Sequence, residues 1–404
     1  MTPRNLLFFG KLALYTALGG VPPEQCLPIL LDVGTDNEAL LHDPIYIGCQ
    51  HKRIRGQEYD DFIDAFVTAV KRRWPNILLQ WEDFAGENAL RLLDRYRDQL
   101  CTFNDDVQGT AAVTTGTLLA AVNATGKPLS EQRIAMFGSG SAGVGIATML
   151  IAALREQGLT DAEARSHIYA FNRNGLIVEG DPSLRGSQIP LAHSQAEIAG
   201  WDWSKNGQPS LLETIRNAGI TVLVGTSAQP GAFTEDVVRA MAASSERPII
   251  FPLSNPTSKC EAAPADVLRW TAGRALVGTG SPSAPVEING RLVQISQINN
   301  SYIFPGLALG ILISNAKRVT DGMLMAAAKQ LAALSPALTD PTKSLLPKMA
   351  RSREISRAVA HAVVNQAVNE GLATIDPGAD IDELIGDYVW EPIYHPYERV
   401  GTFF

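Results

Sequence analysis

The segment Phe137-Gly138-Ser139-Gly140-Ser141-Ala142-Gly143 constrains the fold of this chain more than any other. It matches GxGxxG, it directly follows an apolar strand candidate at 133–137, and it opens an apolar helix at 140–157. In such a turn the first glycine permits the sharp bend, the second lets a pyrophosphate approach the backbone, and the third lets helix and strand pack. The alternative is a glycine-rich turn with only a structural role. The context favours a dinucleotide site contacted by Gly138, Ser139, Gly140, Ala142 and Gly143.

Alternating elements extend this unit into an α/β fold. A strand at 167–172 closes the first βαβ unit, and further apolar strands then alternate with amphipathic helices. We therefore expect a Rossmann-like, doubly wound sheet covered by helices on both faces. The later strands are predicted at 221–225, 248–253 and 275–277, and the helices at 210–218, 234–243 and 263–272.

The flanking segments predict a second, split α/β domain. Before the glycine turn, the patterns predict a helix at 56–74, a strand at 77–81, and helices at 87–100 and 109–123. After the sheet, Asn289-Gly290 predicts a hairpin, and helical patterns follow at 305–316, 321–334 and 353–370. We expect a nucleotide domain at 107–299 inserted in a substrate domain made of 1–106 and 300–371, with a wrapping tail at 372–404 and the active site in the cleft between the domains.

Charge and cysteine usage exclude several classes of protein. The 404 residues carry 34 Lys and Arg against 42 Asp and Glu, a net charge of -8, so no basic surplus is available for nucleic acid or an anionic membrane. A small-molecule substrate is the better expectation. The four cysteines are far apart and include no CxxC, which is typical of reduced thiols in the cytoplasm. Gly10 and Lys11 interrupt the apolar start of the chain, which argues against a signal peptide, and no later stretch reaches the length of a membrane span.

The end of the second strand bears on coenzyme choice. An acidic residue usually meets the adenosine ribose there, but this chain has Phe171-Asn172-Arg173-Asn174. Asn172 can hydrogen-bond a ribose hydroxyl, and Arg173 can face a 2′-phosphate or lie in a solvated loop. The usual mark of NAD is absent, and both NAD and NADP remain open.

Two pairs of carboxylates follow short apolar segments. Glu82 and Asp83 come after the strand at 77–81, and Asp105 and Asp106 follow Asn104. Three such oxygen ligands suit Mg²⁺ or Mn²⁺, whereas a single acidic pair is more often a solvated loop. The amides of Asn255, Asn299 and Asn300 also lie at predicted strand ends or turns, where they orient a substrate or cap a turn.

Taken together, these segments resemble the malic enzymes over about residue 9 to the C-terminus. The resemblance is collinear, which makes it specific. It is carried by Gly10-Lys11-Leu12, Leu14-Tyr15-Thr16-Ala17, Leu31-Asp32-Val33-Gly34-Thr35-Asp36-Asn37, Glu82-Asp83-Phe84, Cys101-Thr102-Phe103-Asn104-Asp105-Asp106-Val107-Gln108-Gly109-Thr110, Leu253-Ser254-Asn255-Pro256-Thr257, Gly280-Ser281-Pro282 and the segment from Asn299 to Gly306.

The resemblance implies a metal-dependent oxidative decarboxylation of L-malate to pyruvate and CO₂, with NAD or NADP as coenzyme and Mg²⁺ or Mn²⁺ as metal. It implies that Lys11 is the catalytic base beside Asp105, that malate and nicotinamide meet the asparagines Asn255, Asn299 and Asn300, and that the chain forms dimers or tetramers. The metal ligands it implies are Glu82, Asp83 and Asp106.

The start of the chain departs from the family pattern. Family members carry, ahead of the lysine, a segment with a tyrosine that acts as general acid and a glycine-rich stretch with an arginine that holds malate, and residues 1–8 match neither. We expect a malic enzyme lacking that N-terminal segment. Two other interpretations stay open: a malolactic enzyme, which releases lactate from malate, and a catalytically impaired nucleotide-binding fragment.

Overall fold

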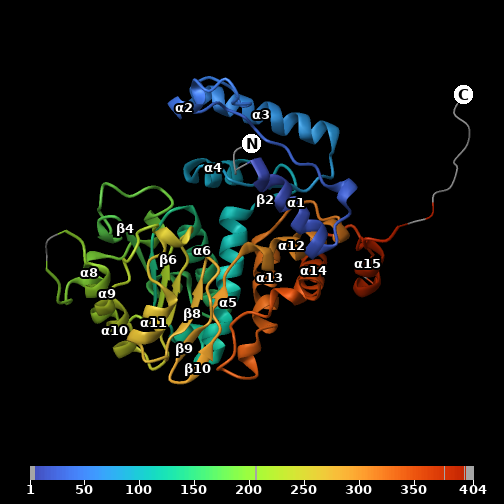
Figure 1. Cartoon of the computed structure of the whole chain (residues 1–404). Helices are drawn as coiled ribbons and strands as arrows, with labels where there is room; N and C mark the ends of the chain where they lie inside the picture. Colours follow the sequence, from blue (N-terminus) through green and yellow to red (C-terminus); the bar gives the residue numbers. More distant parts are fainter. Residues whose placement is uncertain (1–4, 205–206, 377, 395, 397–404) are drawn as a thin grey trace, which may run out of the picture.

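A computed structural model describes residues 5–204, 207–376, 378–394 and 396 (Figure 1). A parallel sheet with its covering helices forms one side of the molecule, a group of long helices forms the other, and a small lobe built around α3 lies across both. In the described part of the chain, no helix combines the length and the apolar character needed to cross a bilayer.

The main sheet has seven strands in the order β11-β8-β7-β6-β3-β4-β5. The order of β4, β3, β6, β7 and β8 is that of a doubly wound dinucleotide fold, which confirms the predicted fold class. The last edge strand differs from a fully parallel expectation, because Arg173 and Asn174 return the chain and β5 pairs antiparallel with β4. The strands are β3 (Ile134–Phe137), β4 (Ile168–Asn172), β5 (Gly175–Leu176), β6 (Val222–Gly225), β7 (Ile249–Pro252), β8 (Leu276–Thr279) and β11 (Ser296–Gln297).

Helices cover both faces of this sheet, as predicted. Alternate residues of a strand point to opposite faces, and in β3 the side chains of Ile134 and Met136 join the core shared with α5 and α6, whereas Ala135 joins the core shared with α9, α10 and α11. The helices of this part are α5 (Thr110–Thr125), α6 (Ser141–Glu156), α7 (Asp161–Ser166), α8 (Gln195–Ile198), α9 (Leu211–Ala218), α10 (Glu235–Ser244) and α11 (Pro264–Trp270).

The long helices lie on the side of α5 away from the sheet, and α13 packs directly against α5. Helix α12 lies between α1 and α14, and α13 contacts both α5 and α14. The bounds of this group are α1 (Asn5–Gly19), α12 (Phe304–Ser314), α13 (Asp321–Ala333) and α14 (Ser352–Asn369). The predicted helices at 305–316, 321–334 and 353–370 are confirmed, but α1 was not predicted, because its almost unbroken apolar sequence shows no amphipathic period.

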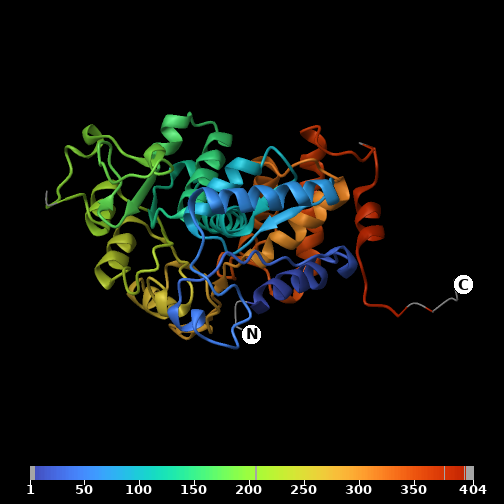
Figure 2. The same cartoon turned by 90° about the horizontal axis from the view of Figure 1, so that it is seen from above.

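Part of the expected tail is a docked helix. Helix α15 (Ile381–Tyr388) lies beside α12 and α14 (Figure 2) and buries Ile385 in a cluster with Leu309 and Val364. Beyond it, the N–H of Trp390 donates to the carbonyl of Gly20. The tail therefore connects the C-terminal helices to the end of α1.

The small lobe carries two short parallel strands, β1 (Leu79–Trp81) and β2 (Thr102–Asn104). Trp81 fills its core and stacks on Tyr96 with ring centroids 5.9 Å apart. The predicted helix at 56–74 ends one residue early, at Arg73. The helices of the lobe are α2 (Glu38–Leu41), α3 (Gly56–Arg73) and α4 (Gly86–Tyr96).

Outside this lobe, the hairpin predicted at Asn289-Gly290 is confirmed. Its two strands are β9 (Val286–Ile288) and β10 (Arg291–Val293).

Candidate active site

The two carboxylate pairs follow neighbouring strand ends. In the register of β1 and β2, Trp81 lies opposite Asn104, so Glu82 and Asp105 are the next residues of two adjacent parallel strands. The chain then enters a π-helical turn, Asp105–Gly109, which leads directly into α5. A short parallel pair of strands thus places these acidic side chains at one edge.

Lys11 reaches this edge from α1. Its ammonium nitrogen lies 2.7 Å from Asp105 Oδ2 and 2.9 Å from Glu82 Oε1. The same nitrogen lies 4.3 Å from the centre of the Phe304 ring, on the first turn of α12. Three segments far apart in the sequence therefore hold one cation between two carboxylates and an aromatic face.

Burial and charge act against each other on Lys11. Burial lowers the pKa of Lys11, but the negative charges of Asp105 and Glu82 and the hydrogen bonds to them raise it more, so the pKa lies above the usual value for lysine. In this arrangement Lys11 carries its proton at neutral pH. Neutralising either carboxylate lowers the pKa of Lys11, so that Lys11 loses its proton more easily and can act as a base.

Asp105 is fully buried, with none of its side chain exposed. Its Oδ2 accepts from Lys11 and from the Asn300 amide, whose Nδ2 lies 3.0 Å away. Its Oδ1 receives no hydrogen bond from any residue that the structure describes. A Cβ on Gly109 would lie 1.8 Å from that oxygen, so only glycine leaves room for the carboxylate there.

Glu82 and Asp106 are partly buried carboxyl groups in a crowded acidic site. Burial and the charge of Asp105 raise the pKa of Glu82 to about 7, although Lys11 opposes the shift. Burial also raises the pKa of Asp106, against the hydrogen bond of 2.7 Å that its Oδ2 accepts from the Asp83 N–H. Asp83 itself has a left-handed backbone, with φ of 59°.

Over the described ranges, no three His, Cys, Asp or Glu side chains are grouped as a ready set of metal ligands. Asp106 is engaged by the Asp83 backbone, and Lys11 supplies the positive charge between Glu82 and Asp105. The ligand set Glu82, Asp83 and Asp106 therefore stays a prediction.

The glycine turn lies between β3 and α6 at the carboxyl edge of the main sheet. Gly138 has φ of 116°, and a Cβ on Gly143 would lie 1.9 Å from the Gly138 carbonyl oxygen, so both positions require glycine. A Cβ on Gly140 would meet no atom within 4 Å, which leaves open space beside the start of α6. Ser139 accepts a hydrogen bond from Gln188, and Ala142 lies in the first turn of α6.

The glycine turn and the acidic edge are neighbours. Ser141, the first residue of α6, donates from Oγ to the carbonyl of Gly86, the first residue of α4, at 2.7 Å. Helix α6 also packs on the π-helical turn, where a Cβ on Gly145 would lie 3.2 Å from Val107. The structure thus brings the predicted dinucleotide turn to the strand ends that carry the carboxylates.

The predicted ribose-facing residues follow β4. The Asn172 Oδ1 accepts from the Asn174 N–H at 2.7 Å, which closes the turn into β5. Arg173 is exposed and forms no ion pair with the residues described. That Asn172 and Arg173 face the ribose stays a prediction.

The three predicted substrate asparagines lie in different settings. Asn300 contacts Asp105 as described, and its Oδ1 accepts from Thr110 at 3.2 Å. Asn299 caps the turn that follows it, because its Oδ1 accepts from the Ser301 N–H. Asn255 is exposed after β7, and its Oδ1 accepts from Ser281 Oγ at 2.5 Å. Their contacts with a substrate stay predictions.

Sequence reasoning missed two polar residues of this site. The Tyr15 hydroxyl donates to Gln80 Oε1, and Gln80 Nε2 donates to Glu82 Oε2 at 2.7 Å. Tyr15 lies four residues after Lys11 on α1, and Gln80 lies two residues before Glu82 on a strand. A spacing of four places Lys11 and Tyr15 on one face of the helix, and a spacing of two places Gln80 and Glu82 on one face of the strand. These spacings were the sequence signal that could have identified Tyr15 and Gln80.

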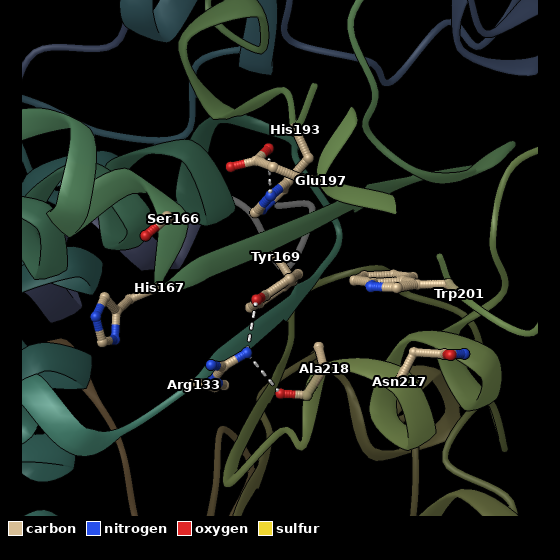
Figure 3. A pocket seen from close by; sticks show the side chains of 9 residues that line it. All are labelled: Arg133, Ser166, His167, Tyr169, His193, Glu197, Trp201, Asn217 and Ala218. Carbon is tan, nitrogen blue, oxygen red and sulfur yellow. Dashed lines mark hydrogen bonds and ion pairs between the residues drawn. The ribbon is translucent and has the colours of Figure 1, made fainter. Parts of the chain in front are cut away.

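A separate cavity of about 290 Å³ lies at the opposite, amino edge of the sheet (Figure 3). Its polar groups are engaged by protein: Arg133 donates to the carbonyl of Ala218 at 3.0 Å, and His193 stacks on Tyr169 with its Nε2 2.9 Å from a backbone carbonyl. Strand β3 runs from this edge to the glycine turn, so the cavity is not part of the site described above.

Two protein-family models match the chain. "Malic enzyme, N-terminal domain" matches residues 6–97, and "Malic enzyme, NAD binding domain" matches residues 107–368. An NAD-dependent malic enzyme of Pseudomonas savastanoi pv. phaseolicola is 51% identical over 390 residues, which cover 96% of this chain and 69% of that protein. One from Aeromonas hydrophila subsp. hydrophila is 52% identical over 392 residues, covering 97% and 69%.

Solved structures of malic enzymes have a fold similar to that of this chain. The Entamoeba histolytica malic enzyme aligns with a TM-score of 0.71 at 23% identity, over 94% of this chain and 67% of that one. The malic enzyme from Pyrococcus horikoshii aligns with a TM-score of 0.68 at 25% identity, over 95% and 75%. With both family models and relatives at half identity, the chain belongs to the malic enzyme family.

Proposed function

We propose that this protein catalyses the oxidative decarboxylation of L-malate to pyruvate and CO₂, with NAD as the hydride acceptor. The observation that carries the proposal is the contact of Lys11 with Asp105 and Glu82, at strand ends that adjoin the glycine turn. Its relatives are named NAD-dependent malic enzymes, which supports the choice of NAD.

The acidic edge has the chemistry of a site for a hard divalent cation. Four acidic residues follow the ends of β1 and β2: Glu82, Asp83, Asp105 and Asp106. Lys11 pairs with Glu82 and Asp105, and one buried Asp105 oxygen has no donor in the described structure. Mg²⁺ and Mn²⁺ prefer carboxylate oxygens as protein ligands. The residues that would hold such an ion are Glu82, Asp83 and Asp106. When bound, such an ion supplies Lewis-acid polarisation of the oxygen on C2 of malate.

Lys11 is the group of this chain that moves the proton. Lys11 acts in its unprotonated form, which neutralisation of Glu82 or Asp105 favours because it lowers the pKa of Lys11. The free amine takes the proton of the malate 2-hydroxyl while hydride passes from C2 to the coenzyme, which gives the 2-keto acid. Breaking the bond between C3 and the adjacent carboxylate then releases CO₂ and leaves the enolate of pyruvate, which takes up a proton at C3 from water. Asp105 and Glu82 hold the ammonium in place, and Phe304 covers one side of it.

The domain arrangement belongs to the same proposal. All seven strands of the main sheet lie between Ile134 and Gln297, which supports a nucleotide domain at 107–299. Residues before and after it, from α1 and from α12, meet at Lys11 and Phe304, which supports a substrate domain made of two separate segments.

The test is turnover of L-malate by the purified chain with NAD and Mn²⁺. We expect NADH and pyruvate in equal amounts, and none without metal. Lactate without net NADH would identify a malolactic enzyme instead, and coenzyme binding without either product would identify a nucleotide-binding fragment. NADP in place of NAD gives the coenzyme preference in the same assay.

A further inference from the structure

Glu261 is a fully buried carboxylate that the proposed mechanism does not use. None of its surface is exposed, and it lies on the loop between β7 and α11. A Cβ on Gly225, the last residue of β6, would lie 2.6 Å from its carboxyl carbon, so glycine is required for the carboxylate to approach the strand. Burying a charged group this deeply is costly unless its oxygens are hydrogen-bonded.

Both oxygens of Glu261 are hydrogen-bonded, and the donors come from two loops. Ser227, after β6, donates to Oε1 through its N–H at 2.8 Å and its hydroxyl at 2.9 Å. Ser254, after β7, donates to Oε1 through its hydroxyl at 2.5 Å and to Oε2 through its N–H at 3.3 Å. The carboxylate therefore ties the carboxyl ends of β6 and β7 to each other.

These contacts continue to the residues on either side. The Ser254 oxygen accepts from the N–H of Ala228 at 2.8 Å, and Ala228 has a left-handed backbone with φ of 54°, which a non-glycine residue rarely adopts without support. Asn255 directly follows Ser254 and accepts from Ser281 on the next loop. The position of Asn255 thus depends on a network whose buried centre is Glu261.

The placement of the two loops indicates what they serve. Strands β6 and β7 follow β3 in the sheet on the side away from β4. In this fold the pyrophosphate lies at the turn after β3, the adenosine half over β4, and the nicotinamide half over the strands on the other side. We infer that Glu261 is a positioning residue, which holds the loops after β6 and β7 so that Asn255 meets the nicotinamide half of the coenzyme. This inference rests on the proposed function.

The contact pattern requires a carboxylate and not an amide. A carboxylate only accepts hydrogen bonds, whereas the amide of glutamine carries two donors on one side. Each oxygen of Glu261 accepts a hydrogen bond from a backbone N–H: Oε1 from Ser227 and Oε2 from Ser254. A backbone N–H can only donate, so neither of these partners can accept a hydrogen bond instead. In the variant Glu261→Gln, either orientation of the amide therefore turns its NH₂ group toward a backbone donor.

The experiment compares two ligands that share the adenosine and pyrophosphate groups. NADH contains the nicotinamide and ADP-ribose lacks it, so binding of each is measured to the unaltered full chain and to Glu261→Gln. We expect NADH affinity to fall by about tenfold or more, the effect of one unsatisfied buried donor, with ADP-ribose affinity unchanged. Glu235→Gln, an exposed carboxylate paired with Arg239 on α10, is the matched control and leaves both affinities unchanged.

A second variant covers the case in which Glu261→Gln does not fold. Ser254→Ala removes the hydroxyl that joins Glu261 to Ala228 but keeps the carboxylate and both backbone donors. We expect the same selective loss of NADH binding, in smaller measure. In the background Asn255→Ala, either substitution should add little to the loss of NADH affinity, because Glu261 acts through Asn255.

The outcomes separate this inference from the proposed function. If the unaltered chain binds neither NADH nor ADP-ribose, the proposed function is wrong. If the unaltered chain binds both and the variants lose both equally, Glu261 supports the fold generally and the inference is overturned. Unchanged NADH binding in the variants overturns it as well, and additive losses with Asn255→Ala contradict the route through that residue.

Discussion

The ammonium of Lys11 lies 2.7 Å from Asp105 Oδ2, across 94 positions of sequence. Asp105 has no exposed side-chain surface and Lys11 has 18%, so this is a largely buried ion pair. Removing one partner from such a pair leaves an uncompensated charge in a poorly solvated place. Both the reaction and the stability of the protein therefore depend on the same contact.

Lys11→Ala should strongly slow the oxidation of malate and also destabilise the protein. Loss of the proton acceptor lowers the rate by about 10²- to 10⁴-fold, and the unpaired Asp105 costs about 3–5 kcal/mol of unfolding free energy. Turnover and urea unfolding measure the two effects. Adding Asp105→Asn to Lys11→Ala should restore part of the stability and none of the turnover, and a stable, fully active Lys11→Ala would remove this residue from the base role.

Mn²⁺ affinity should fall as the pH drops below about 7. Burial and the charge of Asp105 raise the pKa of Glu82 to about 7, so below that pH a proton occupies the carboxyl group and must leave before a cation binds. For one such proton the affinity changes by at most about tenfold per pH unit. Calorimetric titration from acidic to mildly basic pH measures it.

Two variants control this measurement. Glu82→Gln should flatten the part of the pH profile near 7, because the titrating group is gone. Asp106→Asn should weaken Mn²⁺ binding at every pH, since it removes a proposed ligand. Equal affinity in Asp106→Asn and the unaltered chain would show that Asp106 does not hold the metal.

Two glycines of one turn should respond differently to the same substitution. In Gly143→Ala the new Cβ would lie 1.9 Å from the backbone oxygen of Gly138, so the turn must shift, at about 1–3 kcal/mol of stability. In Gly140→Ala the Cβ meets no atom within 4 Å, and stability should stay within about 0.5 kcal/mol. Thermal unfolding measures this difference.

Gly140→Ala should affect coenzyme binding although it leaves the stability of the protein nearly unchanged. Because Gly140 leaves open space at the start of α6, a pyrophosphate can approach there, and Gly140→Ala should weaken NAD binding in a protein that is otherwise stable. Full NAD affinity in folded Gly140→Ala would place the pyrophosphate elsewhere.

Asn172→Asp should select against NADP. The Asn172 oxygen accepts from the Asn174 N–H, and an aspartate oxygen can accept the same bond, so the turn after β4 should persist. The added negative charge would repel a 2′-phosphate and lower NADP affinity by about tenfold or more, with NAD affinity kept or improved. Binding of both coenzymes to both proteins is the measurement, and unchanged NADP affinity would mean that this position does not face the ribose.

The sequence alone determined the parts of this protein whose signals are local. The strand, glycine turn and helix around Gly138 and Gly143 are predicted from the GxGxxG pattern between two apolar segments, and the structure confirms that both positions require glycine. Glu82 and Asp105 were placed at strand ends because each follows a short apolar run, and the hairpin at Asn289-Gly290 follows from the conformational preference of those two residues.

Only the tertiary structure decided which distant groups meet. Helix α1 has an apolar sequence without a clear period, so its helical state and the approach of Lys11 to Asp105 come from its packing on α12 and α14. Glu261 shows no sequence signal, because its donors are two backbone N–H groups and two serine hydroxyls on loops that meet only when β6 and β7 pair. Local preferences act over a few residues, whereas a buried charge is held by whatever the completed fold places around it.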